Sequence, residues 1–184
     1  MDELSLYVLD ITMNSVRAGA AEISVTLREE GEWLDFTVTD NGCGMTEEQV
    51  QKLTDPFFTT RKTRKVGLGI PFLTMLAEMT GGFVEIESKQ QTADSTDHGT
   101  KIHGRFGRTH IDFVPLGDLT SSVTTLIQGS PDVDFVYTHQ TEKGSVSLAC
   151  ADLRAVLGED ISLAEPEILM WIEGNLREQY QLLK

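Results

Sequence analysis

Hydrophobic and polar residues alternate along residues 22–29 and 33–39. A period of two predicts two strands that each bury one face, and Glu30-Gly31-Glu32 between them predicts a tight turn. Residues 83–88 and 99–106 are predicted as two further strands. The polar stretch 90–98 separates them as a loop.

Apolar positions at helical spacing follow a different period. Within residues 3–18 they predict a helix that stops at Gly19; the apolar positions are Leu6, Leu9, Met13 and Val16. Thr46, followed by two acids, predicts the start of a short helix that reaches about residue 53. A third helix is predicted to begin after the glycines near residue 68. It tolerates Pro71 in its first turn and ends at Gly81-Gly82.

The last third of the chain has an α+β pattern of its own. Residues 118–128 predict a helix capped by Asp118, and residues 134–138 and 145–149 predict a hairpin. A short helix over 152–157 and a longer one over 166–183 follow. We find no cluster of reactive side chains in this part, so we expect it to pack on the first part or to present a partner surface.

Charge narrows the choice of ligands. With 15 Lys and Arg against 29 Asp and Glu, the net charge of −14 argues against nucleic acid as the main partner. One run inverts this sign, Arg61-Lys62-Thr63-Arg64-Lys65, and it indicates either an exposed loop or an anion site. The two cysteines lie far apart without metal-ligand spacing, and no apolar run suits a membrane span. We therefore expect a soluble cytoplasmic protein that binds no membrane.

Two groups of polar residues can carry chemistry. Asp10, Asn14 and Arg17 are spaced to share one helix face, although an amphipathic helix has such a polar face in any case. Asp40 precedes two glycines in Asp-Asn-Gly-Cys-Gly-Met, which is either an ordinary turn or a carboxylate held beside a ligand. The glycines before the third helix also place its N-terminus where an anion can bind.

The order of these motifs resembles that of the GHKL ATPases, which include gyrase, Hsp90-type chaperones, histidine kinases and MutL-type repair proteins. Their N, G1, F and G2 boxes correspond here to four stretches within residues 1–108: Asp10…Asn14, Asp40-x-Gly42-x-Gly44, Phe57-Phe58-Thr59-Thr60 and Gly67-x-Gly69. Each motif is weak alone, but the ordered set is specific. The resemblance implies an ATP and Mg²⁺ site.

The resemblance assigns the adenine end of that site. Asp40 corresponds to the acid that accepts a hydrogen bond from the adenine amino group and so favours ATP over GTP. Gly42, Gly44 and Met45 would form the turn beside the base. Thr100 matches a threonine near the adenine.

The phosphate end follows in the same way. Asn14 corresponds to the asparagine whose amide oxygen ligates Mg²⁺, and Arg17 would lie near a phosphate. Gly67, Leu68 and Gly69 would cradle phosphates at a helix N-terminus. The resemblance also implies a lid over residues 46–66, which brings further groups near the triphosphate: Thr60, Arg61, Lys62, Arg64 and Lys65.

The local sequence of these motifs is most similar to that of histidine kinases, with some departures. Lys65 stands where a glycine of Gly-x-Gly-Leu-Gly is usual, which implies a stiffer lid hinge. Those kinases also need an upstream helical hairpin with a phospho-acceptor histidine, whereas the N box here begins almost at residue 1. None of the four histidines has the expected context. We therefore expect a chain that is not a self-sufficient sensor kinase.

Asp10 limits what can be inferred about the chemistry. Histidine kinases usually carry Asn at this position, while gyrase-like ATPases and anti-sigma serine kinases carry a Glu that acts as a general base. Asp is one methylene shorter, so we expect weak or partner-dependent turnover. Three hypotheses stay open: a slow ATPase switch acting on a protein partner, a stand-alone Ser/Thr or in-trans histidine kinase, and a non-catalytic ATP-binding module.

The fold that the resemblance implies is a two-layer α/β sandwich, the Bergerat ATP-binding fold, with a mixed sheet covered by helices on one face. We expect residues 1–108 to form the ATP-binding domain. Residues 109–184 would be an appended α+β segment that serves a protein partner or a second copy of the chain.

Overall fold

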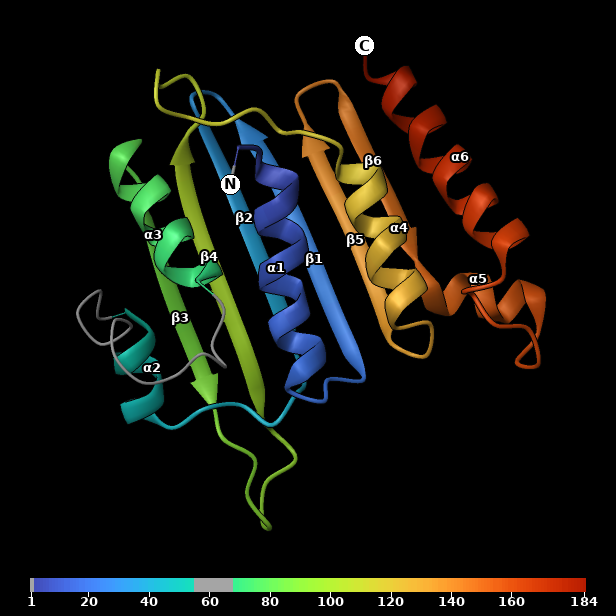
Figure 1. The fold of residues 1–184 in the computed structure, drawn as a ribbon, viewed down its shortest axis with the longest axis horizontal. Helices are drawn as coiled ribbons and strands as arrows, with labels where there is room; N and C mark the ends of the chain where they lie inside the picture. Colours follow the sequence, from blue (N-terminus) through green and yellow to red (C-terminus); the bar gives the residue numbers. More distant parts are fainter. Residues whose placement is uncertain (1, 55–67) are drawn as a thin grey trace.

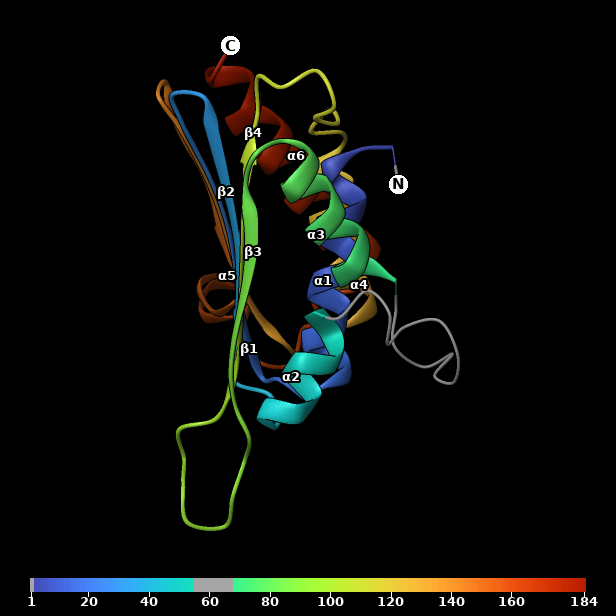
Figure 2. The ribbon, with the colours of Figure 1, turned by 90° about the vertical axis from the view of Figure 1, so that its left-hand side faces the viewer.

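A single sheet with helices on one face organises the molecule (Figures 1 and 2). The computed structural model describes residues 2–54 and 68–184. Its six strands follow the order β3-β4-β2-β1-β5-β6, and only β1 and β5 are parallel neighbours. The expected two-layer mixed α/β architecture is therefore confirmed.

The elements lie close to the predicted ranges. The strands are β1 (Glu22–Glu30), β2 (Trp33–Asp40), β3 (Phe83–Lys89), β4 (Gly99–Gly107), β5 (Asp134–Thr141) and β6 (Gly144–Ala149). The helices described are α1 (Leu4–Arg17), α2 (Glu47–Thr54), α3 (Gly69–Met79), α4 (Leu119–Gly129), α5 (Cys150–Leu157) and α6 (Pro166–Leu182).

Local sequence signals set several of these boundaries. The Thr46 hydroxyl accepts from the Gln49 backbone N–H at 3.2 Å, and the Gln49 side chain accepts from the Thr46 N–H at 2.9 Å, so α2 begins with a reciprocal capping box. Asp118 caps α4 by accepting from Ser121 N–H at 2.9 Å, as predicted. Gly19, with φ of 73°, follows the end of α1.

The buried face of α1 differs from the apolar stripe seen in the sequence. Leu4, Val8 and Ile11 are fully buried, whereas Leu6 is 41% exposed. Leu9, Met13 and Val16 are only partly buried. The physical reason is position: α1 lies on the sheet between α3 and α4, so its flanks are also covered and can carry apolar residues (Figure 1).

The C-terminal part extends the same sheet. After α4, β5 runs parallel to β1 in continuous register, and β6 returns antiparallel as the edge strand. Buried residues of both parts, such as Leu27 on β1 and Tyr137 on β5, belong to one hydrophobic cluster. The boundary expected near residue 108 falls in the connection between β4 and α4, and residues 109–184 are joined to the first part by main-chain pairing and by a shared core.

Helix α6 covers the β6 edge. Its apolar face buries Leu169, Ile172 and Leu176, as the spacing predicted. The Gln179 side chain accepts from Ser147 N–H at 2.9 Å and donates to Ser147 C=O at 3.0 Å, so it satisfies main-chain groups that an edge strand otherwise leaves open. In the described ranges, 2–54 and 68–184, the helices are all too short or too polar to traverse a bilayer.

Candidate functional site

The turn that follows β2 holds the Asp40 carboxylate with three donors. Ser15 Oγ donates to Oδ2 at 2.6 Å, Gly42 N–H donates to Oδ1 at 2.9 Å, and Thr100 N–H donates to Oδ1 at 3.3 Å. These donors come from α1, from the turn itself and from β4. The carboxylate is therefore fixed by three parts of the fold that are far apart in sequence.

The glycines of this turn are required by contacts with the protein itself. A β-carbon on Gly42 would lie 2.9 Å from the Ala18 side chain and 3.0 Å from Asp40 Oδ1. Gly44 has φ of 65°, and a β-carbon there would lie 1.9 Å from the Lys89 carbonyl oxygen. Glycine thus lets the turn pack against the end of α1 on one side and the end of β3 on the other.

Ser88, at the end of β3, links the turn to Thr100. Its hydroxyl accepts from Met45 N–H at 2.8 Å and donates to Gly99 C=O at 3.0 Å. It also lies 2.8 Å from Thr100 Oγ1. Met45 and Thr100, which the resemblance assigns to the adenine end, are therefore joined through a serine that the sequence motifs do not include.

A cavity of about 550 Å³ opens beside these groups, where β2, β3 and β4 meet α2. Its lining includes Asp40, Thr100 and Ser88 with Val50 and Ile86 as apolar walls. Ligand pockets commonly measure roughly 300–1,000 Å³ and combine apolar walls with a few polar groups. The cavity and its acidic anchor fit the base of a nucleotide.

The loop between β3 and β4 is tied to the same turn. His98 Nδ1 lies 2.6 Å from the Gly42 carbonyl oxygen, and Gln91 N–H donates to the Cys43 carbonyl at 2.8 Å. At the cavity mouth Lys89 pairs with Asp97. The hydrogen bond from Lys89 lowers the pKa of the Asp97 carboxyl. The loop therefore supports the turn through contacts with two of its carbonyl groups.

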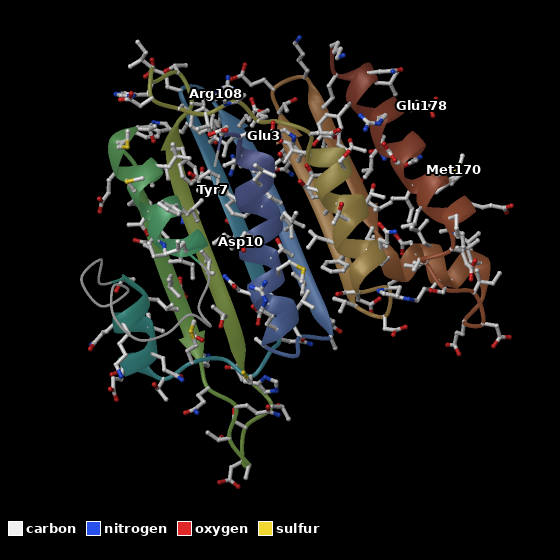
Figure 3. All side chains as sticks on the ribbon, in the orientation of Figure 1. Glu3, Tyr7, Asp10, Arg108, Met170 and Glu178 are labelled. Atoms are coloured by element: carbon white, nitrogen blue, oxygen red, sulfur yellow. The ribbon has the colours of Figure 1, made fainter. Side chains whose placement is uncertain are left out.

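The other end of the site lies at the start of α3. Asp10, about one turn after Tyr7 on α1 (Figure 3), reaches the first residue of α3. A β-carbon on Gly69 would lie 2.0 Å from Asp10 Oδ2. Leu68 is the N-cap residue, and α3 has no acid in its first turn and no side-chain cap. The positive end of α3 therefore faces a carboxylate supplied by α1.

Asn14 and Arg17 lie along α1 beyond Asp10. Arg17 donates to the Asn14 amide oxygen at 3.1 Å, and both groups are accessible to solvent. An amide oxygen one helical turn from a carboxylate is a suitable donor for Mg²⁺, a hard cation. The donor type fits, and the Asn14 amide oxygen that would ligate Mg²⁺ has a second lone pair beside the one that accepts from Arg17.

Part of the expected site lies outside the described residues. This applies to Thr60, Arg61, Lys62 and Gly67, and to the Phe57–Thr60 motif. In the part that is described, α1 joins the two ends of the site. Asp10 meets α3 and Ser15 meets Asp40, and five residues of helix separate them by about 7.5 Å along the axis.

Sequence reasoning missed Ser15 and Ser88. A signal for each was present. Ser15 directly follows Asn14, and Ser88 lies two residues after Ile86 in a strand, so the side chains of Ser88 and Ile86 point to the same face of the sheet. Small polar residues beside a motif are common, and only the register of β3 with β4, which pairs Ser88 with Thr100, makes Ser88 significant.

Comparison with known proteins gives a consistent result for the first 110 residues. A family model described as "Histidine kinase-, DNA gyrase B-, and HSP90-like ATPase" matches residues 2–110. The sensor histidine kinase ZraS of Escherichia coli K12 is 32% identical over 91 residues, which cover 48% of this chain and 19% of that protein. Sporulation kinase B of Bacillus subtilis is 32% identical over 92 residues, which cover 48% of this chain and 21% of that protein. The chain thus spans about a fifth of each relative.

A solved structure extends the likeness in fold. The MutL ATPase domain of Aquifex aeolicus, complexed with ADP, superposes with a TM-score of 0.55 at 15% identity. The match covers 85% of this chain and 68% of that chain. Since 85% exceeds the share of the 184 residues within 2–110, the likeness in fold continues into the C-terminal part.

Proposed function

The chain belongs to the family of histidine kinase-, DNA gyrase B- and HSP90-like ATPases, and we propose that it binds Mg-ATP as a slowly hydrolysing switch that acts on a protein partner. The observation that supports this most directly is the anchored Asp40 carboxylate at the wall of a cavity of about 550 Å³. ATP, when bound, supplies the γ-phosphoryl group, and Mg²⁺ offsets the charge of the phosphates.

At the adenine end, Asp40 binds and orients the base. An ionised carboxylate only accepts hydrogen bonds, so it suits the exocyclic amino group of adenine and not the carbonyl of guanine. Because Ser15, Gly42 and Thr100 already hold the carboxylate, it needs no reorganisation to accept a ligand N–H. Preorganisation of this kind lowers the cost of binding.

At the phosphate end, the N-terminus of α3 attracts phosphate and Asp10 accepts a proton. The free N–H groups and the dipole at the start of a helix favour an anion, and α3 has no acidic side chain of its own in its first turn. Asp10 Oδ2 lies against Gly69, so its carboxylate stands beside the proposed phosphate position. There it can take a proton from an attacking water as a general base.

Slow turnover follows from the same placement. The Asp10 carboxylate occupies the positive end of α3 that the phosphate also needs, and like charges at one place repel. Asp also reaches one methylene less than Glu, and a general base acts only within hydrogen-bond distance of the proton that it removes. We therefore expect a partner to be needed for fast hydrolysis.

A second candidate is phosphoryl transfer to another protein. The names of the relatives, sensor histidine kinase and sporulation kinase, favour it. Each histidine of this chain is held in a contact with its own protein; the partners are Gly42 for His98, Asp35 for His103, Asp112 for His110 and Glu29 for His139. An acceptor histidine, serine or threonine would then lie on the partner. A non-catalytic ATP-binding role is the third candidate.

The partner surface is part of the same proposal. The outer face of α6 exposes Met170 (73%) and Trp171 (55%), and Figure 3 shows Met170 on the side of α6 that faces away from the sheet. This face suits a protein partner or a second copy of the chain. Sedimentation of wild type against Met170→Ser/Trp171→Ser tests the homodimer, which a concentration-independent monomer mass would exclude.

Radiolabelled ATP tests the three functions together. The purified chain is incubated with Mg²⁺ and [γ-³²P]ATP, alone and with candidate partners. Release of labelled phosphate by the chain supports the switch, label on a partner supports the kinase, and recovery of intact bound ATP supports the binding module. Equal affinity for ATP and GTP would contradict the role of Asp40 and with it all three.

A further inference from the structure

Two serines that no motif includes determine which hydrogen-bonding groups the cavity wall offers. We propose that Ser15 and Ser88 are positioning residues, of which Ser15 orients the Asp40 carboxylate and Ser88 holds the Thr100 hydroxyl as an acceptor, and that the resulting Asp40–Thr100 wall selects a 6-aminopurine over a 6-oxopurine. The inference deepens the proposed nucleotide function and rests on it.

Ser15 fixes the orientation of the Asp40 carboxylate through Oδ2. A carboxylate has about four acceptor positions. Gly42 N–H and Thr100 N–H both donate to Oδ1, and Ser15 Oγ donates to Oδ2 at 2.6 Å. One acceptor position is left, on Oδ2. Ser15 is only 3% exposed, so it acts on a ligand through Asp40.

Ser88 determines the direction of the Thr100 hydroxyl. Ser88 has one hydrogen and two lone pairs, and it accepts from Met45 N–H while it donates to Gly99 C=O. One lone pair is left for Thr100 Oγ1 at 2.8 Å, so all three contacts are satisfied only when Thr100 is the donor. The hydrogen of Thr100 then points to Ser88, and its oxygen can only accept from the cavity.

Together the two residues give the wall one polarity. Asp40 and Thr100 line the same cavity, and Asp40 Oδ2 and Thr100 Oγ1 are both acceptors in this arrangement. The 6-amino group of adenine donates to such a wall directly. A 6-oxo group would place a third acceptor against two others, and an unpaired polar group that leaves water weakens binding.

The test compares three purine triphosphates, each with Mg²⁺: ATP with an amino group at position 6, inosine triphosphate with an oxo group there and a hydrogen on N1, and purine riboside triphosphate with hydrogen at position 6. We expect Ser15→Ala to weaken ATP binding by about tenfold and to leave the affinity for purine riboside triphosphate unchanged. The lost hydrogen bond orients Asp40, and Asp40 contacts only the 6-amino group, which purine riboside triphosphate lacks. Dissociation constants are measured by titration calorimetry.

For Ser88→Ala we expect the ratio of ATP affinity to inosine triphosphate affinity to fall by about tenfold, because the freed Thr100 hydroxyl can turn and donate to the oxo group. Ser88→Thr keeps the hydroxyl and should restore the ratio. Ser145→Ala makes the same change at an exposed position on β6 and should alter nothing. Thermal unfolding of each variant checks that it is folded.

Equal weakening of all three nucleotides by Ser15→Ala and Ser88→Ala would overturn the inference and leave only a structural role for both serines. Failure of the proposed function is a separate result: the wild type would bind none of the three nucleotides, or the Asp40→Asn variant would bind ATP as tightly as the wild type does. A wild type that prefers ATP through Asp40 while both serine variants behave like wild type would overturn the inference alone.

Discussion

Asp10 Oδ2 lies 2.0 Å from the point where a β-carbon on Gly69 would stand. The first residue of α3 must therefore be glycine for α1 to bring its carboxylate to that helix start. The contact joins two sequence boxes that are 59 residues apart, and it makes Gly69 a residue that positions Asp10 as well as one that approaches phosphate.

Gly69→Ala is expected to move Asp10 and to disturb the fold little. The atom in the way is the end of a side chain that can rotate, so we expect the free energy of unfolding to change by less than about 1 kcal/mol. ATP hydrolysis should fall more than ATP affinity does. Gly174→Ala on α6, where a β-carbon meets nothing within 4 Å, is the matched control and should stabilise the chain by about 0.5–1 kcal/mol.

Asp10→Asn is expected to lower the rate of hydrolysis or phosphoryl transfer by roughly 10²–10⁴-fold, which is the usual contribution of a general base. Mg-ATP affinity should stay the same or rise, because the change removes a negative charge beside the phosphate position. Single-turnover kinetics and calorimetry measure the two effects. An unchanged rate would show that Asp10 is no base.

Gly44→Ala is expected to destabilise the turn after β2 much more than Gly81→Ala destabilises the end of α3. Both glycines have positive φ, 65° and 79°, so alanine strains the backbone at both, by about 1 kcal/mol. Only Gly44 also meets the carbonyl oxygen of Lys89, and a main-chain atom cannot rotate away. Urea unfolding of the two variants measures the difference; equal losses would mean that β3 can shift.

The partly buried network around Glu29 is expected to make stability depend on pH. Glu29 accepts from His139 Nε2 at 2.8 Å and pairs with Arg108, while His139 Nδ1 lies 2.8 Å from the Tyr180 hydroxyl on α6. The hydrogen bond to His139 lowers the pKa of the Glu29 carboxyl. Its contribution is therefore full above the ordinary carboxyl pKa and is lost as pH falls through the lowered value.

Replacing Glu29 by Gln should remove that part of the acid sensitivity and lower the free energy of unfolding at pH 7 by about 1–2 kcal/mol. Glu178→Gln, on the outer face of α6 (Figure 3), is the control and should leave the pH profile as in wild type. Denaturant unfolding between pH 3 and pH 7, which is roughly the range in which carboxyl groups titrate, gives the free energy of unfolding as a function of pH. A variant as acid-sensitive as wild type would exclude Glu29 as the cause.

The sequence by itself determined the elements and the family, because these depend on local chemistry. Strand alternation, the Thr46 and Asp118 caps and the Gly19 stop act within a few residues, and the ordered motifs identified the family to which residues 2–110 belong. Only the tertiary structure decided which residues meet. The pairing of β5 with β1, the buried face of α1, and the contacts of Ser15 with Asp40 and Asp10 with Gly69 join distant parts of the chain. Such contacts depend on sheet order and helix packing, which no local pattern encodes.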